Sequence, residues 1–110
     1  MFVQLTNMEQ WRVLKRHSVE SPILLLKYSL GSPVSAAILQ QLRESSAAGQ
    51  FHQLIHLVVV QENKEIAEAI DRDLNTDSAV PQVIIMKNTQ CIGSSTSEHL
   101  GSILPLMQPL

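Results

Sequence analysis

Two short apolar runs, each followed by a segment with helical periodicity, limit the folds open to this chain more than any other feature. The first run covers residues 23–28, between Pro22 and Gly31, and the second covers residues 54–60 and is rich in β-branched side chains. Apolar runs of this length are typical of strands buried on both faces of a sheet. Because a helical segment follows each run, the alternation predicts right-handed crossovers between parallel strands.

Helix starts are marked by capping residues, and helix faces by apolar residues three or four positions apart. The first helix is expected to begin at a capping box in residues 6–9 (Thr-Asn-Met-Glu), the third after Asn63, and the fourth at a second box in residues 95–98 (Ser-Thr-Ser-Glu). The second opens at Ser32-Pro33, where an N-cap residue precedes a proline at the first helical position. The side chains expected to face the core are Met8, Trp11, Val13, Leu14, Val34, Ala37, Ile38, Leu42, Ile66, Ile70, Leu74, Leu100, Ile103, Leu104 and Met107.

A hairpin is expected between the third and fourth helices. Residues 83–86 (Val-Ile-Ile-Met) predict a strand, residues 87–90 (Lys-Asn-Thr-Gln) a tight turn, and Cys91-Ile92 the start of the partner strand. The expected order is therefore αβαβαββα within one domain spanning residues 1–110. A mixed four-stranded sheet with helices on both faces is the thioredoxin-like α/β architecture, although a flavodoxin-like half shares the same alternation.

Composition excludes several classes of partner and compartment. The net charge is −2, and the eight Lys and Arg residues are scattered, so no basic stripe is available for nucleic acid. No apolar run reaches the ~18 residues of a membrane span, and the first residues lack the basic and apolar regions of a signal peptide. A single cysteine excludes an internal disulfide framework and fits a reducing compartment. We therefore expect a cytoplasmic domain with neither nucleic acid nor membrane as partner.

Neither the cysteine nor the histidines predict a reactive or metal-binding centre. Cys91 falls on an expected strand, away from any helix N-terminus that would lower its pKa, so we interpret it as an inert, partly buried side chain. His52 and His56 are four residues apart, but on an extended strand that spacing separates them too far to share a metal. The sequence therefore predicts no metal and no resident cofactor.

Two junctions carry a resemblance to a known family. Residues 27–35 (Lys-Tyr-Ser-Leu-Gly-Ser-Pro-Val-Ser) follow the first apolar run, and residues 80–83 (Val-Pro-Gln-Val) lead into the third. Together they resemble the monothiol bacilliredoxins, YtxJ-like proteins of the thioredoxin-like superfamily. The active site of that family reads roughly Lys-His-Ser-x-x-Cys-Pro-Ile-Ser, and its later loop reads Ser-Pro-Gln. Residues 58–66 are also similar, so the resemblance covers nearly the whole chain and implies a thiol–disulfide oxidoreductase that removes bacillithiol from proteins.

The chain departs from the family pattern where the chemistry would occur. The family's cysteine falls on Ser32 and the preceding histidine on Tyr28, and the family's later tryptophan and histidine have no counterpart in residues 92–96. A cysteine at a helix N-terminus reacts as a thiolate, which the macrodipole stabilises, and attacks a disulfide sulfur. A serine hydroxyl cannot form a sulfur–sulfur bond. The sequence therefore predicts that Ser32 occupies a degenerate nucleophile position.

The resemblance also implies a binding face. In the thioredoxin-like superfamily the proline before the third core strand is cis and faces the active-site helix, leaving the preceding backbone groups free for an extended peptide or thiol. The positions that correspond to this face are Gly31, Ser32, Pro33, Ser35, Val80 and Pro81. Bacillithiol and glutathione are candidate ligands, by analogy with serine-type glutathione transferases, whose hydroxyl holds a thiol sulfur at this place.

Three functions are compatible with the sequence. The first is a redox-inactive binding module whose pseudo-active site recognises a protein client or a low-molecular-weight thiol. The second is a cytoplasmic thiol–disulfide oxidoreductase in which a serine has replaced the cysteine at position 32. The third is a structural or interaction protein that forms a homo-oligomer, such as a homodimer with an apolar interface.

Overall fold

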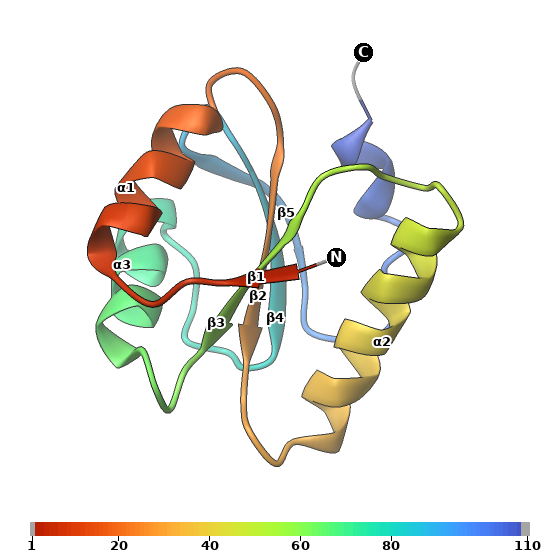
Figure 1. Cartoon of the computed structure of the whole chain (residues 1–110), viewed down its shortest axis with the longest axis horizontal. Helices are drawn as coiled ribbons and strands as arrows, with labels where there is room; N and C mark the ends of the chain where they lie inside the picture. The colour runs from red at the N-terminus through yellow and green to blue at the C-terminus, as the bar shows by residue number, and fades with distance from the viewer. Residues whose placement is uncertain (1, 109–110) are drawn as a thin grey trace.

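A five-stranded mixed sheet forms the centre of the computed structural model, which describes residues 2–108 (Figure 1). The strand order is β1-β3-β2-β4-β5, with β1 and β2 parallel to β3, β4 antiparallel to β2, and β5 antiparallel to β4. The strands are β1 (Phe2–Gln4), β2 (Ile23–Tyr28), β3 (Ile55–Val59), β4 (Gln82–Lys87) and β5 (Gln90–Ser95). The mixed α/β sheet expected from the sequence is present, with one strand more than predicted.

The additional strand, β1, was not predicted because it is three residues long and mostly exposed. So short a segment carries no periodicity, and it becomes a strand only by pairing with β3, where Val3 lies opposite His56. The pairing continues beyond the strand, because the Leu5 amide donates to the Leu57 carbonyl at 2.8 Å. β1 thus forms an edge of the sheet that tertiary contacts alone define.

Helices cover both faces of the sheet (Figure 1). α1 (Met8–His17) and α3 (Lys64–Leu74) pack on one face, and α2 (Pro33–Ala47) packs on the other with the 3₁₀ helix η1 (Leu104–Met107). The predicted core residues that are buried are Trp11, Leu14, Ile38, Leu42, Ile66, Ile70, Leu74, Leu100, Ile103, Leu104 and Met107, while Met8, Val13 and Ala37 are partly buried. None of the helices in the described part of the chain is long and apolar enough to span a membrane.

The capping box of α1 lies one residue later than predicted. Asn7, rather than Thr6, is the N-cap, and its side-chain oxygen accepts a hydrogen bond from the Gln10 amide at 2.9 Å. Gln10 completes the box by accepting from the Asn7 amide at 3.2 Å. Asparagine is as good an N-cap as threonine, and the predicted partner Glu9 instead pairs with Arg12 along the helix surface.

The predicted helix beginning at residues 95–98 is absent. β5 extends to Ser95, whose hydroxyl accepts from the Ser97 amide in a local turn, and the only helix described after it is the four-residue η1. Pro105 lies in the first turn of η1 and cannot continue an α-helix begun earlier in the chain. The apolar residues predicted for this helix are nonetheless buried. The apolar pattern therefore predicted correctly which residues enter the core, but not the secondary structure in which they lie.

The hairpin between β4 and β5 has the predicted two-residue turn. Asn88 and Thr89 both have positive φ angles, 53° and 60°, as the tight hairpin turn requires. Ser18, the buried C-cap of α1, holds this turn, because its carbonyl accepts from the Asn88 amide at 2.8 Å and its hydroxyl from the Thr89 amide at 2.9 Å. The hairpin is therefore fixed to the end of α1.

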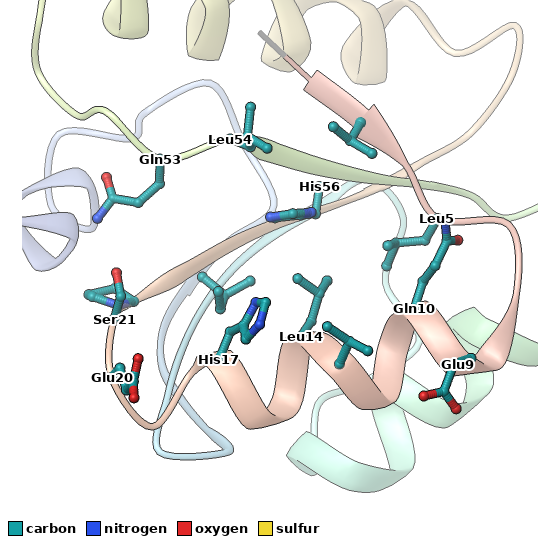
Figure 2. A pocket seen from close by; sticks show the side chains of 14 residues that line it. Leu5, Glu9, Gln10, Leu14, His17, Glu20, Ser21, Gln53, Leu54 and His56 are labelled. Atoms are coloured by element: carbon teal, nitrogen blue, oxygen red, sulfur yellow. The ribbon is translucent and has the colours of Figure 1, made fainter.

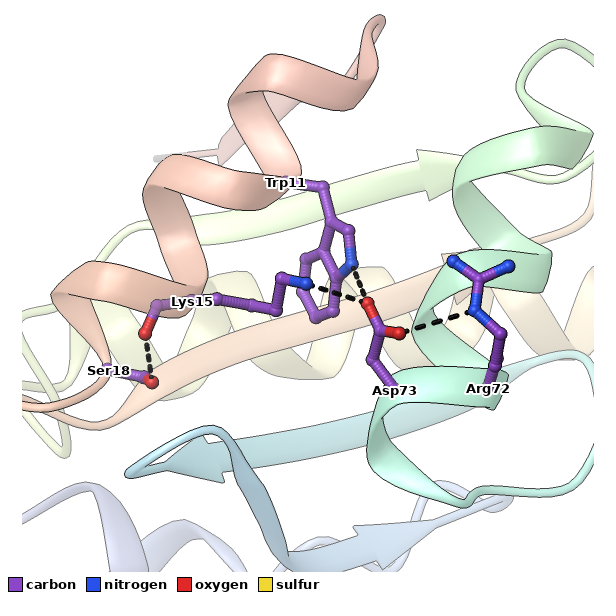
Figure 3. Close-up of polar contacts among 5 residues, drawn as sticks. All are labelled: Trp11, Lys15, Ser18, Arg72 and Asp73. Atoms are coloured by element: carbon purple, nitrogen blue, oxygen red, sulfur yellow. Dashed lines mark hydrogen bonds and ion pairs between the residues drawn. The ribbon is translucent and has the colours of Figure 1, made fainter.

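A polar cluster joins α1 to α3 (Figure 3). The Asp73 carboxylate accepts hydrogen bonds from the fully buried Trp11 Nε1 at 2.9 Å and from Lys15 Nζ at 2.8 Å. Arg72 Nε lies 3.4 Å from the other carboxylate oxygen. The hydrogen bond from Lys15, more than that from Trp11, holds the pKa of Asp73 below its usual value, although burial opposes this. Asp73 is thus an ionised acceptor that satisfies a buried indole.

Replacing Asp73 by alanine removes this acceptor and leaves the indole N–H of Trp11 unpaired. We expect Asp73→Ala to lower the free energy of unfolding by about 1–3 kcal/mol in urea denaturation, the cost of an unsatisfied buried donor. Asp73→Asn keeps an oxygen that accepts from the indole, so its loss should be smaller. Equal losses in the two variants would contradict the assigned role.

His56 is the one titratable side chain of β3 and lies beside the edge strand β1. Its Nδ1 atom is enclosed and has no hydrogen-bond partner among the described residues. Burial, and secondarily the nearby His17, lowers the pKa of His56 below the ordinary value of 6.5. The folded protein therefore binds a proton at His56 more weakly than the unfolded chain does.

This difference in pKa predicts a pH dependence of stability. The contribution of neutral His56 is fully present above pH 6.5 and is lost as the pH falls through the lower folded-state pKa. We expect the free energy of unfolding to decrease between about pH 7 and pH 5 in the unmodified chain, and this part of the decrease to disappear in His56→Phe. The exposed His52 is the control position. A pH profile that is the same for His56→Phe and His52→Phe would refute this role of His56.

Candidate functional site

The two predicted site segments lie at one end of the sheet. β2 ends at Tyr28 and β4 begins at Gln82, and the antiparallel register places Lys27 opposite Gln82. The loop of residues 29–32 and the segment before β4 therefore leave the sheet at the same end (Figure 1). The Val80–Pro81 peptide bond in that segment is cis. We call this end, made by residues 29–34 and 80–81, the Ser32 face.

Ser32 is the N-cap of α2, as the sequence predicts. Its Oγ accepts a hydrogen bond from the Ser35 amide at 3.1 Å, and its carbonyl accepts from the Ala36 amide at 3.1 Å. Pro33 occupies the first helical position, where no amide hydrogen is needed. The hydroxyl of Ser32 thus lies at the positive end of a 15-residue helix, with its hydrogen left for an acceptor.

The loop before Ser32 is held from two sides. The buried Ser35 hydroxyl accepts from the Ser29 amide at 3.1 Å, so Ser35 supports the loop from within. Gln61, which follows β3, donates to the Ser29 hydroxyl at 2.8 Å and accepts from the Leu30 amide at 3.0 Å. Gly31 adopts φ +78°, a backbone conformation that favours glycine. These contacts fix the direction in which α2 starts.

Sequence reasoning missed Gln61, although a signal for it exists. β2 and β3 are parallel and adjacent, so their carboxyl ends meet at the same edge of the sheet. A polar residue directly after the second strand therefore lies beside the loop that follows the first.

The segment before β4 is held by a buried lysine. Lys27 is fully buried in β2, and its Nζ donates to Asp71 Oδ1 at 2.6 Å and to the Asp77 carbonyl at 2.8 Å. Asp71 Oδ1 also accepts from the Thr76 hydroxyl at 2.8 Å, and Gln82 Nε2 lies 3.4 Å from Asp77 Oδ1. The connection from α3 to β4 is therefore tied to the central strand just before it reaches Val80.

The exposed surface of the Ser32 face is uncharged and partly apolar. Leu30, Val34 and Val80 expose 52%, 47% and 38% of their surface, and no charged residue occurs between Tyr28 and Ser35. Val34 was predicted to face the core, and this is wrong, because the buried side of α2 begins at the neighbouring Ser35 and Val34 lies beside that stripe. Such a surface suits an apolar or extended ligand.

The single thiol is remote from Ser32. Cys91 lies on β5 opposite Met86, near the hairpin end of β4, whereas the Ser32 face lies at the other end of that strand. Four residues of strand, about 13 Å at ~3.3 Å per residue, separate the two ends. The Cys91 side chain is partly buried against the α1–α3 layer. Within residues 2–108 no group of three or more His, Cys, Asp or Glu side chains is placed to hold a metal ion.

Known proteins share this fold. Mitochondrial thioredoxin 3 from Saccharomyces cerevisiae, in its oxidized form, superposes with a TM-score of 0.74 at 17% identity, covering 99% of this chain and 95% of that one. Thioredoxin from Fasciola hepatica gives a TM-score of 0.77 at 13% identity, covering 98% and 100%, and thioredoxin NaTrxh from Nicotiana alata gives 0.77 at 11%, covering 98% and 93%. At these identities the likeness shows the fold alone, and it confirms the thioredoxin-like prediction. No curated protein matches the sequence significantly.

The family is shown by the sequence itself. The model of the monothiol bacilliredoxin BrxC family matches residues 3–101, which include both junctions on which the resemblance rests. Fold and family are those of thiol–disulfide oxidoreductase-like proteins. With this match over nearly its whole length, the chain belongs to the monothiol bacilliredoxin family.

Proposed function

We propose that this family member is a cytoplasmic binding module that uses the Ser32 face to recognise an extended protein segment or a low-molecular-weight thiol. We further propose that it does not exchange thiols and disulfides at position 32. The observation that carries the proposal is the Ser32 hydroxyl at the N-terminus of α2, where the family pattern has a cysteine. An oxygen there can hold a sulfur by a hydrogen bond but cannot bond to it covalently as sulfur does.

The first turn of α2 has hydrogen-bond donors that can bind an electron-rich ligand atom. Ser35 and Ala36 direct their amides to Ser32, and Pro33 has no amide hydrogen, so the Val34 amide is the first-turn donor left for a ligand. The Ser32 hydroxyl and the Val34 amide can therefore both donate to one anionic or sulfur atom placed at the helix end. A thiol sulfur, or a carbonyl oxygen of an extended peptide, fits this pair of donors.

The segment at Val80 supports recognition of an extended chain. Residues 80–81 precede β4 and lie outside the ladder with β2, which begins at the Lys27–Gln82 pair. A peptide laid beside Val80 would extend the sheet's hydrogen bonding and place its side chains against the apolar Leu30 and Val34. Lys27 and Gln61 keep the two segments in place without a ligand, which lowers the ordering cost of binding.

An oxidoreductase whose cysteine has been replaced is the second candidate. The hydrogen bonds that position Ser32 would position a cysteine at the same N-cap, where a thiolate pKa falls from ~8.5 into the range of ~3.5–7.5. Restoring the sulfur therefore tests recognition by the face directly.

We expect Ser32→Cys to form mixed disulfides with client proteins or with bacillithiol or glutathione under oxidising conditions. The captured species would be identified by mass spectrometry. Both this variant and the control carry Cys91→Ala, which removes the background thiol. The matched control is Ala47→Cys, exposed at the opposite end of the same helix, where the dipole disfavours a thiolate. Capture by Ser32→Cys that is no greater than by Ala47→Cys would show that the face recognises neither ligand.

A further inference from the structure

The Ser32 face has no positive charge to offer a ligand. Residues 29–34 and 80–81, which make up the face, are all uncharged. Lys27, the cation nearest to the face in the sequence, is fully buried, and its Nζ donates to Asp71 and to the Asp77 carbonyl. Lys27 therefore cannot reach out to pair with a carboxylate of a bound molecule.

The other seven of the chain's eight lysine and arginine side chains are engaged elsewhere. Arg43 lies over the Phe2 ring, 5.8 Å from its centroid. At ~1.5 Å per residue, Arg43 is about 15 Å along α2 from Pro33. The remaining six contact a carboxylate or a carbonyl on the helices or beside the hairpin: Arg12 and Arg16 approach Glu9, Lys15 and Arg72 approach Asp73, Lys64 approaches Glu68, and Lys87 donates to the Val19 carbonyl.

Two carboxylates without a cation partner lie at the same end of the sheet as the Ser32 face. Asp77 is exposed in the connection that leads to Val80. β5 ends at Ser95, beside the start of β4, so the exposed Glu98 follows that strand at this end of the sheet. Neither carboxylate forms an ion pair with any described residue. Their charges therefore favour a cationic ligand and oppose an anionic one.

We propose that the Ser32 face selects an extended protein segment in which basic side chains flank apolar ones, and that it rejects anionic low-molecular-weight thiols. This selectivity rests on the proposed function. The apolar side chains of the segment contact the exposed Leu30, Val34 and Val80, and its basic side chains lie toward Asp77 and Glu98. Glutathione and bacillithiol carry more carboxylates than ammonium groups, and no cation of the face would pair with them.

The test uses a thiol at position 32 to report what the face accepts. The Ser32→Cys, Cys91→Ala variant is mixed with disulfides of 5-thio-2-nitrobenzoate. The new thiolate bonds to the probe sulfur, and the nitrobenzoate thiolate leaves with the electron pair and is followed by its absorbance. The probes are an acetylated and amidated Ala-Val-Cys-Val-Ala peptide, the same peptide with both alanines replaced by lysine or by aspartate, and glutathione. Each rate is divided by that of a 2-hydroxyethyl probe on the same variant, which corrects for thiolate reactivity.

We expect the lysine peptide to react about threefold or more faster than the aspartate peptide and the glutathione probe, with the uncharged peptide between them. The differences should shrink at ~1 M salt, where charges are screened beyond ~3 Å. An aspartate peptide or a glutathione probe that reacts as fast as the lysine peptide would overturn the selectivity alone. The proposed function itself fails if no probe gains more over the 2-hydroxyethyl probe in Ser32→Cys than in the Ala47→Cys control.

Two double variants assign the selectivity to particular carboxylates. Adding Asp77→Asn and Glu98→Gln should reduce the preference for lysine over aspartate by about twofold or more, without changing the rate of the uncharged peptide. The matched control is Glu20→Gln with Glu44→Gln, which changes the net charge equally and should keep the preference. Glu20 lines the groove between α1 and the β1–β3 edge, near the start of β2, and Glu44 lies in the last turn of α2 (Figure 2). Equal loss of the preference in both double variants would contradict the proposal.

Discussion

The Ser32 face depends on a lysine buried in the central strand. Lys27 lies in β2 among apolar neighbours, and its ammonium is satisfied by Asp71 at the end of α3 and by the Asp77 carbonyl in the following connection. A buried charge of this kind is tolerated only when it is paired, so the strand, the helix end and the connection must keep one arrangement. Val80 and Pro81 follow that connection directly and enter β4 opposite Lys27. These two hydrogen bonds therefore set where the second half of the face lies relative to the first.

The first half of the Ser32 face, which is the loop of residues 29–32 and the start of α2, is also held in a fixed position, but by different contacts. Gln61 and Ser35 hold the loop that leads into α2, and Ser32 then caps the helix. A thioredoxin fold offers a helix N-terminus at this point, which in the bacilliredoxin pattern stabilises a thiolate. Here the same electrostatic environment surrounds a hydroxyl. The Ser32 face retains hydrogen-bond donors, apolar neighbours and a fixed backbone, while the residue at position 32 has an oxygen where the family pattern has a sulfur.

The sequence predicts those parts of the fold that depend on local pattern. The runs at 23–28 and 83–86, the turn at Asn88-Thr89 and the apolar stripe of α3 follow from periodicity and turn chemistry, and the structure has them. β1 could not be predicted, because only its pairing with β3 makes three residues a strand. The prediction of a helix after Ser95 is wrong because residues that cap helices also form turns. The apolar residues predicted for that helix are buried from a loop and a short 3₁₀ helix.

The site shows the same division between local and tertiary information. Ser32, Pro33 and Pro81 stand out in the sequence because each has a local signature or belongs to a family motif. The partners of Lys27 lie 44 and 50 residues away, and those of Gln61 lie 31 and 32 residues away, so no local pattern reports them. The sequence predicts that His56 binds no metal, and it gives no sign of the enclosed, unpartnered Nδ1 atom, because that enclosure depends on the tertiary packing around β3.

Hydrogen exchange in a Lys27→Met variant would show whether Lys27 holds the connection before Val80 in place. Methionine keeps the apolar packing of β2 but cannot bind Asp71 or the Asp77 carbonyl. We expect the amides between residues 76 and 80 to exchange about tenfold faster, which corresponds to a local opening about 1.4 kcal/mol easier, while the amides of residues 29–32 and of α1 are unchanged. Unchanged exchange between residues 76 and 80, or equal acceleration throughout the chain, would contradict it.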